Sequence, residues 1–152
     1  MKIKVNQLAN AIKIYQPFSK YKFTWLGNKP PNYCFGYEQL IDSRDTLYIT
    51  GGEKDVLTLS SLGLNAICLN SETAHLPQDL YDDFKLRFKH IYILYDIDET
   101  GLKQSREICK KYNLKRIILT DKLLDKKGKD ISDFIHLGFE FSDENYELDS
   151  TN

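Results

Sequence analysis

The sequence predicts an α/β fold in which helices flank a parallel, Rossmann-like sheet of four strands. Four short apolar runs are expected as the strands, at residues 47–50, 65–69, 91–95 and 116–120. Segments of helical periodicity separate these runs, and strands that alternate with helices are typical of parallel sheets built from right-handed crossovers. Acidic or glycine-rich motifs follow two of the runs, at the strand ends where such sheets bind ligands.

The front of the chain, residues 1–39, is expected to form a small β appendage. Residues 1–38 contain six lysines, the single acid Glu38 and eight of the 19 aromatic residues. Turn signals at Pro17 and in the run GNKPPN replace any helical pattern. Alternating stretches such as YKFTW suit the core of an antiparallel hairpin, but lysines and stacking rings equally suit single-stranded nucleic acid. Lys22 and Trp25 are the candidate nucleic-acid-binding residues, and both interpretations stay open.

Helical patterns fill the gaps between the predicted strands. Apolar residues recur on one face of three segments: Val56, Leu59 and Leu62 in 55–62; Leu80, Phe84 and Phe88 in 80–88; Ile108 and Tyr112 in 102–112. The main domain is therefore expected at residues 40–138. Residues 139–152 carry several acids and no lysine or arginine, so this tail is expected to be solvated and mobile.

Composition limits the class of protein. A chain of 152 residues with 41% hydrophobic content suits one packed core with a small appendage. No apolar run approaches the roughly 20 residues that span a bilayer, and no signal-peptide pattern follows Met1, so we expect a cytoplasmic protein without a membrane partner. Cys34, Cys68 and Cys109 lie far apart without metal-ligand spacing, which indicates free thiols.

The stretch ILYDIDETG places Asp96 and Asp98 at the carboxyl end of the predicted strand 91–95. Residues i and i+2 of an extended chain point the same way, so both carboxylates would face one spot outside the sheet. Two anions so close repel, and a divalent cation, a shared proton or a basic partner must compensate. The alternative is that Asp98 caps a helix starting near Glu99 while Asp96 is solvated.

Two known protein families place aspartates directly after a strand. The run DIDET fits the DxDx[TV] pattern of haloacid-dehalogenase-like phosphatases, which would make Asp96 a nucleophile and Asp98 an acid. That fold begins with this strand and needs later motifs on further strands, whereas only 54 residues follow Asp98. A receiver domain needs an acidic pair after its first strand, where this chain has TGG. Neither family fits the whole chain.

Three motifs occur in order along the chain: LYITGGEKDVLTLSSLG, YILYDIDETG and KGKDISDFI. Together they resemble the Toprim domain of bacterial and phage DNA primases and primase-helicases, over residues 40–138. In that family the acids bind divalent metal. The resemblance implies that Asp96 and Asp98 are metal-binding and catalytic and that Asp130 is the later metal ligand, with Asp133 as second choice.

One position departs from the family pattern. The first motif usually reads EGExD, and Gly51 stands where the first glutamate would be. Glu53 and Asp55 match the remaining acids, and the resemblance makes Glu53 a catalytic candidate. Glu53 could instead be a first-turn acid that favours the helix dipole. Lys54 is predicted to contact a phosphate of the nucleic acid, or else to be solvated.

The resemblance implies metal-dependent nucleotidyl transfer in DNA replication, with Mg²⁺ or Mn²⁺ as cofactor. The implied partners are nucleotides, single-stranded DNA or an RNA/DNA template, and a replicative helicase or flanking primase domains. The stretch PPNYCFGYEQL also resembles the segment that precedes Toprim in such primases. The alternatives are a Toprim nuclease and a degenerate Toprim module that binds nucleic acid or a replication partner without chemistry. Gly51 favours the degenerate module, and the intact DID and GKD favour the enzyme.

Overall fold

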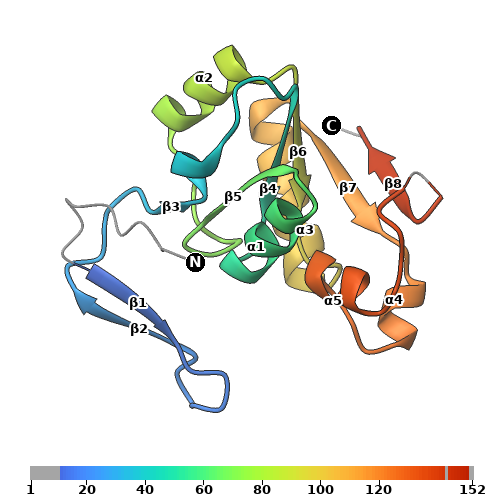
Figure 1. Ribbon diagram of the computed structural model, residues 1–152, viewed down its shortest axis with the longest axis horizontal. Helices are drawn as coiled ribbons and strands as arrows, with labels where there is room; N and C mark the ends of the chain where they lie inside the picture. Colours follow the sequence, from blue (N-terminus) through green and yellow to red (C-terminus); the bar gives the residue numbers. More distant parts are fainter. Residues whose placement is uncertain (1–10, 143, 151–152) are drawn as a thin grey trace. The chain divides into compact units, whose positions relative to one another are not determined.

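The computed structural model describes residues 11–142 and 144–150, which belong to two compact units (Figure 1). The first unit extends to Tyr33 and the second begins at Cys34. This boundary lies closer to the N-terminus than the expected end of the appendage at residue 39. The difference arises because Cys34 and Phe35 already pair with a strand of the main sheet.

The second unit is a mixed α/β fold around a mostly parallel sheet, as the sequence predicts. Its strand order is β3-β5-β4-β6-β7-β8. The strands are β3 (Cys34–Phe35), β4 (Thr46–Thr50), β5 (Asn65–Leu69), β6 (His90–Leu94), β7 (Lys115–Leu119) and β8 (Tyr146–Asp149). The four central strands are parallel, and the edge strands β3 and β8 run antiparallel to their neighbours. Within the described residues, the sheet therefore has six strands in place of the expected four.

Helices cover both faces of this sheet. They are α1 (Glu53–Ser61), α2 (Gln78–Arg87), α3 (Glu99–Tyr112), α4 (Lys122–Asp125) and α5 (Ile131–His136), with a short 3-10 turn η1 at Tyr37–Gln39. One core cluster joins the sheet to Phe84 of α2 and Cys109 of α3. The other joins it to Val56 of α1, Leu123 of α4 and Phe134 of α5. Burial on both faces explains why the central strands read as continuous apolar runs.

Part of the acidic tail is a strand of the sheet. Tyr146–Asp149 forms β8, which pairs with β7, in contrast to the expected mobile tail. The guanidinium of Arg116 in β7 donates to Asp149 Oδ2 from Nε at 2.7 Å and from Nη2 at 2.6 Å. Both side chains are under 10% exposed, at 6% and 9%. This buried ion pair joins residues 33 positions apart, which no local pattern could indicate.

The first unit contains the expected β hairpin. It consists of β1 (Ala11–Tyr15) and β2 (Phe23–Gly27), which pair antiparallel with Lys13 opposite Trp25 and Tyr15 opposite Phe23. Cross-strand partners share a face, so these four side chains lie on one side of the hairpin. A two-stranded hairpin is only marginally stable by itself in water.

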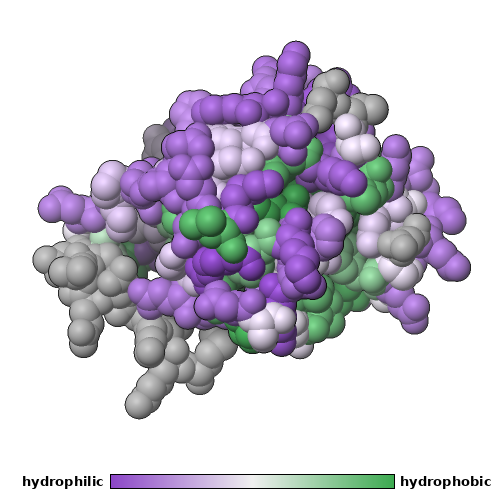
Figure 2. All heavy atoms as spheres, turned by 90° about the horizontal axis from the view of Figure 1, so that it is seen from above, coloured by the Kyte–Doolittle hydropathy of each residue, from purple (hydrophilic) through white to green (hydrophobic). Residues whose placement is uncertain are grey.

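Hydrophilic side chains cover most of the surface visible in Figure 2, with hydrophobic patches between them. Cys34, Cys68 and Cys109 are free thiols, which confirms the prediction from their spacing. Among the described residues, no helix is long and apolar enough to span a bilayer.

The Arg116–Asp149 pair predicts a large effect of a single substitution. Asp149→Ala should lower the free energy of unfolding by about 3 to 5 kcal/mol, because Arg116 would remain buried without its counter-charge. The exposed Glu147 of the same strand is the control, and Glu147→Ala should change stability by less than about 0.5 kcal/mol. Urea unfolding measures both. Equal effects of the two variants would show that β8 does not stabilise the sheet.

Candidate metal centre

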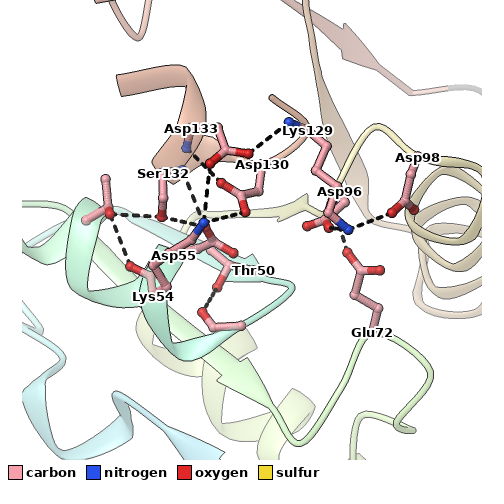
Figure 3. Close-up of polar contacts among 12 residues, drawn as sticks. Thr50, Lys54, Asp55, Glu72, Asp96, Asp98, Lys129, Asp130, Ser132 and Asp133 are labelled. Atoms are coloured by element: carbon pink, nitrogen blue, oxygen red, sulfur yellow. Dashed lines mark hydrogen bonds and ion pairs between the residues drawn. The ribbon is translucent and has the colours of Figure 1, made fainter. Parts of the chain in front are cut away.

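The order of the central strands brings three loops to one edge of the sheet. β4 pairs in parallel with β5 on one side and with β6 on the other, so that Thr50 lies beside Cys68 and Leu94. The segments after β4, β5 and β6 therefore emerge together, at the carboxyl ends of the strands. Figure 3 shows the acidic side chains that they carry and those from the start of α5.

One acidic group, which we call the inner cluster, consists of Asp55, Asp96 and Asp130. One carboxylate oxygen from each lies within 4.8 Å of the others. Asp55 is in the first turn of α1, and Asp130 is the N-cap of α5, where it accepts a hydrogen bond from Asp133 N at 2.8 Å. Asp55 and Asp130 are buried, and helix N-termini favour negative charge at these positions.

A second group, the outer cluster, consists of Glu72, Asp96 and Asp98, again with oxygens within 4.8 Å. Asp98 caps α3, because its Oδ1 accepts from Gly101 N at 2.9 Å. The capping alternative is therefore correct for Asp98, while its other oxygen faces the cluster. Asp96 is not solvated, since only 14% of its side chain is exposed. Asp96 is common to both clusters.

The close approach of α3 to this loop requires a glycine. A Cβ atom on Gly101 would overlap the backbone carbonyl of Asp96. Glycine lets the first turn of α3 pack directly against the loop that carries Asp96 and Asp98. This explains the last letter of the DIDETG run.

Two lysines compensate the carboxylates in this structure. Lys129 Nζ lies 2.7 Å from Asp96 Oδ2 and 2.8 Å from Asp98 Oδ2. The backbone amide of Ile97 donates to Lys129 O at 2.8 Å, which holds the two loops together. A basic partner, one of the three compensations named from the sequence, is therefore present at Asp96 and Asp98.

Lys54 serves the inner cluster in the same way. Its Nζ lies 2.8 Å from Asp130 Oδ2 and 3.4 Å from Asp133 Oδ1. Asp133 also accepts a hydrogen bond from Lys129 N at 3.0 Å. Lys54, predicted to contact a phosphate or to be solvated, is thus ion-paired, and Asp133 holds the loop around Lys129.

Burial and crowding change the acidity of the cluster. Burial, with the charge of Asp130, raises the pKa of Asp55 from 3.8 to about 7, although hydrogen bonds from Ser132 oppose this. Burial likewise raises the pKa of Glu72 to about 7. Asp98 behaves in the opposite way, since hydrogen bonds from Lys129 and Gly101 hold its pKa below the usual range. The site therefore favours a bound proton on one carboxyl of each cluster, Asp55 in the inner cluster and Glu72 in the outer cluster.

The predicted ligands do not form a single group. Asp130 belongs to the inner cluster, Asp98 to the outer cluster, and Asp96 connects them. Glu53, the catalytic candidate, begins α1 and belongs to neither cluster. Its alternative position as a first-turn acid is the observed one.

Sequence reasoning missed Glu72 and treated Asp55 only as a motif match. Glu72 lies three residues beyond the end of β5, in the run NSETA, which resembles no motif. Its position could have indicated a role, because Glu72 is an acid shortly after the predicted parallel strand 65–69.

The nucleic-acid candidates Lys22 and Trp25 lie in the first unit. Lys22 is exposed just before β2, and Trp25 packs edge-on against Tyr33 with ring centroids 5.2 Å apart.

In comparisons with known proteins, no family model matches the chain, and no curated protein matches it. Functional inference therefore depends on the site itself.

The pKa of Asp55 predicts how stability varies with pH. Because the folded state holds this proton more tightly than the unfolded chain, the associated stabilisation is complete below about pH 3.8 and is lost as the pH rises through about 7. Glu72 acts with the same sign. Asp96, Asp130, Ser132 and Lys54 are the groups that face Asp55.

We therefore expect the free energy of unfolding of the metal-free protein to fall between pH 5 and pH 7.5. Asp55→Asn should flatten this fall and stabilise the protein at pH 7.5 by on the order of 2 kcal/mol. Urea unfolding across this range measures both effects. An unchanged slope in Asp55→Asn would contradict the assignment of the proton to this carboxyl.

Proposed function

We propose that this chain contains a Toprim-type domain that carries out metal-dependent nucleotidyl transfer in DNA replication. The observation that carries the proposal is the position of Asp96, which joins two carboxylate clusters at the carboxyl edge of a mostly parallel sheet. Strand order and the sequence motifs agree on this location. Mg²⁺ or Mn²⁺ would be held by Asp96, which is common to both clusters, together with Asp55 and Asp130 of the inner cluster and Asp98 of the outer cluster.

The donor set fits such ions. Magnesium prefers hard oxygen ligands and keeps several waters, so two or three carboxylates with substrate phosphates suffice. Such ions would supply charge stabilisation for an attacking primer 3'-hydroxyl and for the leaving pyrophosphate.

The lysines would then change partners. Lys129 and Lys54 have side chains that are 51% and 61% exposed, so they can turn outward without opening the core. Away from the carboxylates, both ammonium groups can pair with the phosphates of a nucleotide or of a template strand. The same two residues thus neutralise the acids in the absence of metal and bind substrate in its presence.

The hairpin supports a nucleic-acid partner. Residues 11–33 contain four lysines and no acidic residue. Lys13 Nζ lies 4.5 Å from the centroid of the Phe23 ring, and the rings of Tyr15 and Phe23 stack at 5.1 Å. Tyr21 is 69% exposed and Phe18 is fully exposed. Exposed rings among lysines suit the stacked bases and phosphates of single-stranded DNA or an RNA/DNA template.

A second candidate function is a Toprim-type module that binds nucleic acid or a replication partner without chemistry. The ion pairs of Lys129 and Lys54 favour it, because they already neutralise the acids. Primer synthesis would need a replicative helicase or flanking primase domains, whereas the binding module would bind nucleic acid or such a replication partner.

The metal proposal predicts unequal effects of the site aspartates. At about 100 times its dissociation constant, Mg²⁺ or Mn²⁺ should stabilise the wild type by about 2.7 kcal/mol. Asp96→Asn should remove this gain, because Asp96 belongs to both clusters, while Asp98→Asn and Asp130→Asn should each remove part of it. Thermal unfolding with and without metal measures the gain.

The exposed Asp125 on α4 provides the control, and Asp125→Asn should keep the wild-type response. Equal metal responses of Asp96→Asn and the wild type would refute the site. Incorporation of labelled nucleotides on a single-stranded template, with a helicase supplied, separates the two functions. The enzyme requires turnover that Asp96→Asn abolishes, and the binding module shows none.

The hairpin predicts salt-sensitive binding. Trp25→Ala should weaken single-stranded DNA binding by about 1 to 3 kcal/mol through lost stacking. Lys22→Ala should reduce the slope of log affinity against log salt by about 0.7. Anisotropy of a labelled oligonucleotide measures both.

Thr24 lies next to Trp25 on the opposite face of β2, so Thr24→Ala is the matched control. Binding that does not depend on salt, or equal losses of DNA affinity in Thr24→Ala and Trp25→Ala, would contradict the prediction. The aromatic side chains would then serve only to pack the hairpin.

A further inference from the structure

The carboxylate of Glu72 lies in the space that a side chain at position 51 would need. A Cβ atom built on Gly51 would be 2.7 Å from Glu72 Oε1 and 3.1 Å from Asp96 Oδ1. Contacts below 3.0 Å are essentially never made by real Cβ atoms. Any residue other than glycine at this position would therefore displace Glu72.

Strand order explains why this space matters. Glu72 follows β5, Asp96 follows β6, and β4 lies between these two strands. To reach Asp96, the side chain of Glu72 must cross the end of β4, and Gly51 is the first residue beyond that end. Figure 3 shows Glu72 extending from its loop toward Asp96.

The carboxylate of Glu72 is fixed at the end of this crossing. Asp96 N donates to Glu72 Oε1 at 2.8 Å. Lys129 directs its ion pairs to Asp96 and Asp98. Among the described residues, Glu72 makes no ion pair with a lysine or arginine, and its position is set by the hydrogen bond from Asp96 N.

We propose that Glu72 is the third metal-binding carboxylate of the outer cluster and that Gly51 provides the space for it to reach Asp96 across β4. The ligand is a divalent cation that prefers oxygen donors. This inference rests on the proposed function, because it specifies how the same site binds metal. Glu72, in the loop after β5, thus takes the carboxylate role that the sequence predicts for Glu53, which follows β4.

A double-mutant cycle tests the link between the two residues. Titration calorimetry with Mn²⁺ or Mg²⁺ alone should show metal affinity about tenfold or more weaker in Glu72→Gln. Gly51→Ala should also weaken it, because the new methyl group displaces the carboxylate. The double variant should be no weaker than Glu72→Gln alone. Additive losses would overturn the proposal, because Gly51→Ala would then act through Asp96.

Moving the carboxylate back to β4 gives a gain-of-function test. The Gly51→Glu/Glu72→Ala variant should bind metal more tightly than Glu72→Ala, because an acid again extends from the end of β4 toward Asp96. Thermal unfolding without metal verifies that each variant folds. No gain over Glu72→Ala would overturn the proposal.

Two further variants make the outcomes distinguishable. Glu107→Gln on the exposed side of α3 should leave metal affinity unchanged. A greater loss of metal affinity in Glu53→Gln than in Glu72→Gln would return the role to Glu53 and overturn the inference.

If the wild type binds metal and Asp96→Asn does not, but Glu72→Gln binds as the wild type does, this inference alone fails. If the wild type binds no metal, the proposed function fails with it.

Discussion

The parallel pairing of β4 with both β5 and β6 is the constraint on which the rest of the structure depends. A strand paired on both sides and covered on both faces must be apolar, and its side chains fill the two core clusters. The same pairing fixes where the chain leaves the sheet. Three loops must begin side by side at one edge, whatever side chains they carry.

The chain places acids on these loops and on the neighbouring start of α5, and the result is unfavourable electrostatics. Asp96 lies within two groups of carboxylates, and Asp55 is buried. Helix N-termini, the ammonium groups of Lys54 and Lys129, and bound protons offset part of the repulsion. Buried, crowded acids with raised pKa values are characteristic of functional sites.

The lysines give the proposed site two electrostatic states. In the structure, ammonium groups neutralise the acids at distances of 2.7 and 2.8 Å, close to those of strong charge-assisted hydrogen bonds. In the proposed function, a divalent cation would displace these groups, so metal binding would be linked to the release of two positive charges toward a substrate. The proposed enzyme and the proposed binding module differ only in which state prevails.

Local sequence determined the central strands, the three long helices and the acids at strand ends. Each of the four central strands is found within one residue of its expected bounds, because apolar runs and helical periodicity depend on neighbours close in the chain. The motif residues Asp96, Asp98 and Asp130 lie at the expected edge for the same reason. The small strands β3 and β8 carry no such signal, since each exists only through pairing with a distant partner.

Tertiary structure alone decided which acids meet. Strand order places β4 between β5 and β6, and this order brings Glu72 across Gly51 to Asp96 while Glu53 stays outside the clusters. The ion pairs of Lys54 and Lys129, and that of Arg116 with Asp149, likewise join residues between 31 and 79 positions apart. Electrostatic interactions act through space, so their partners are set by the folded arrangement of strands and not by spacing along the chain.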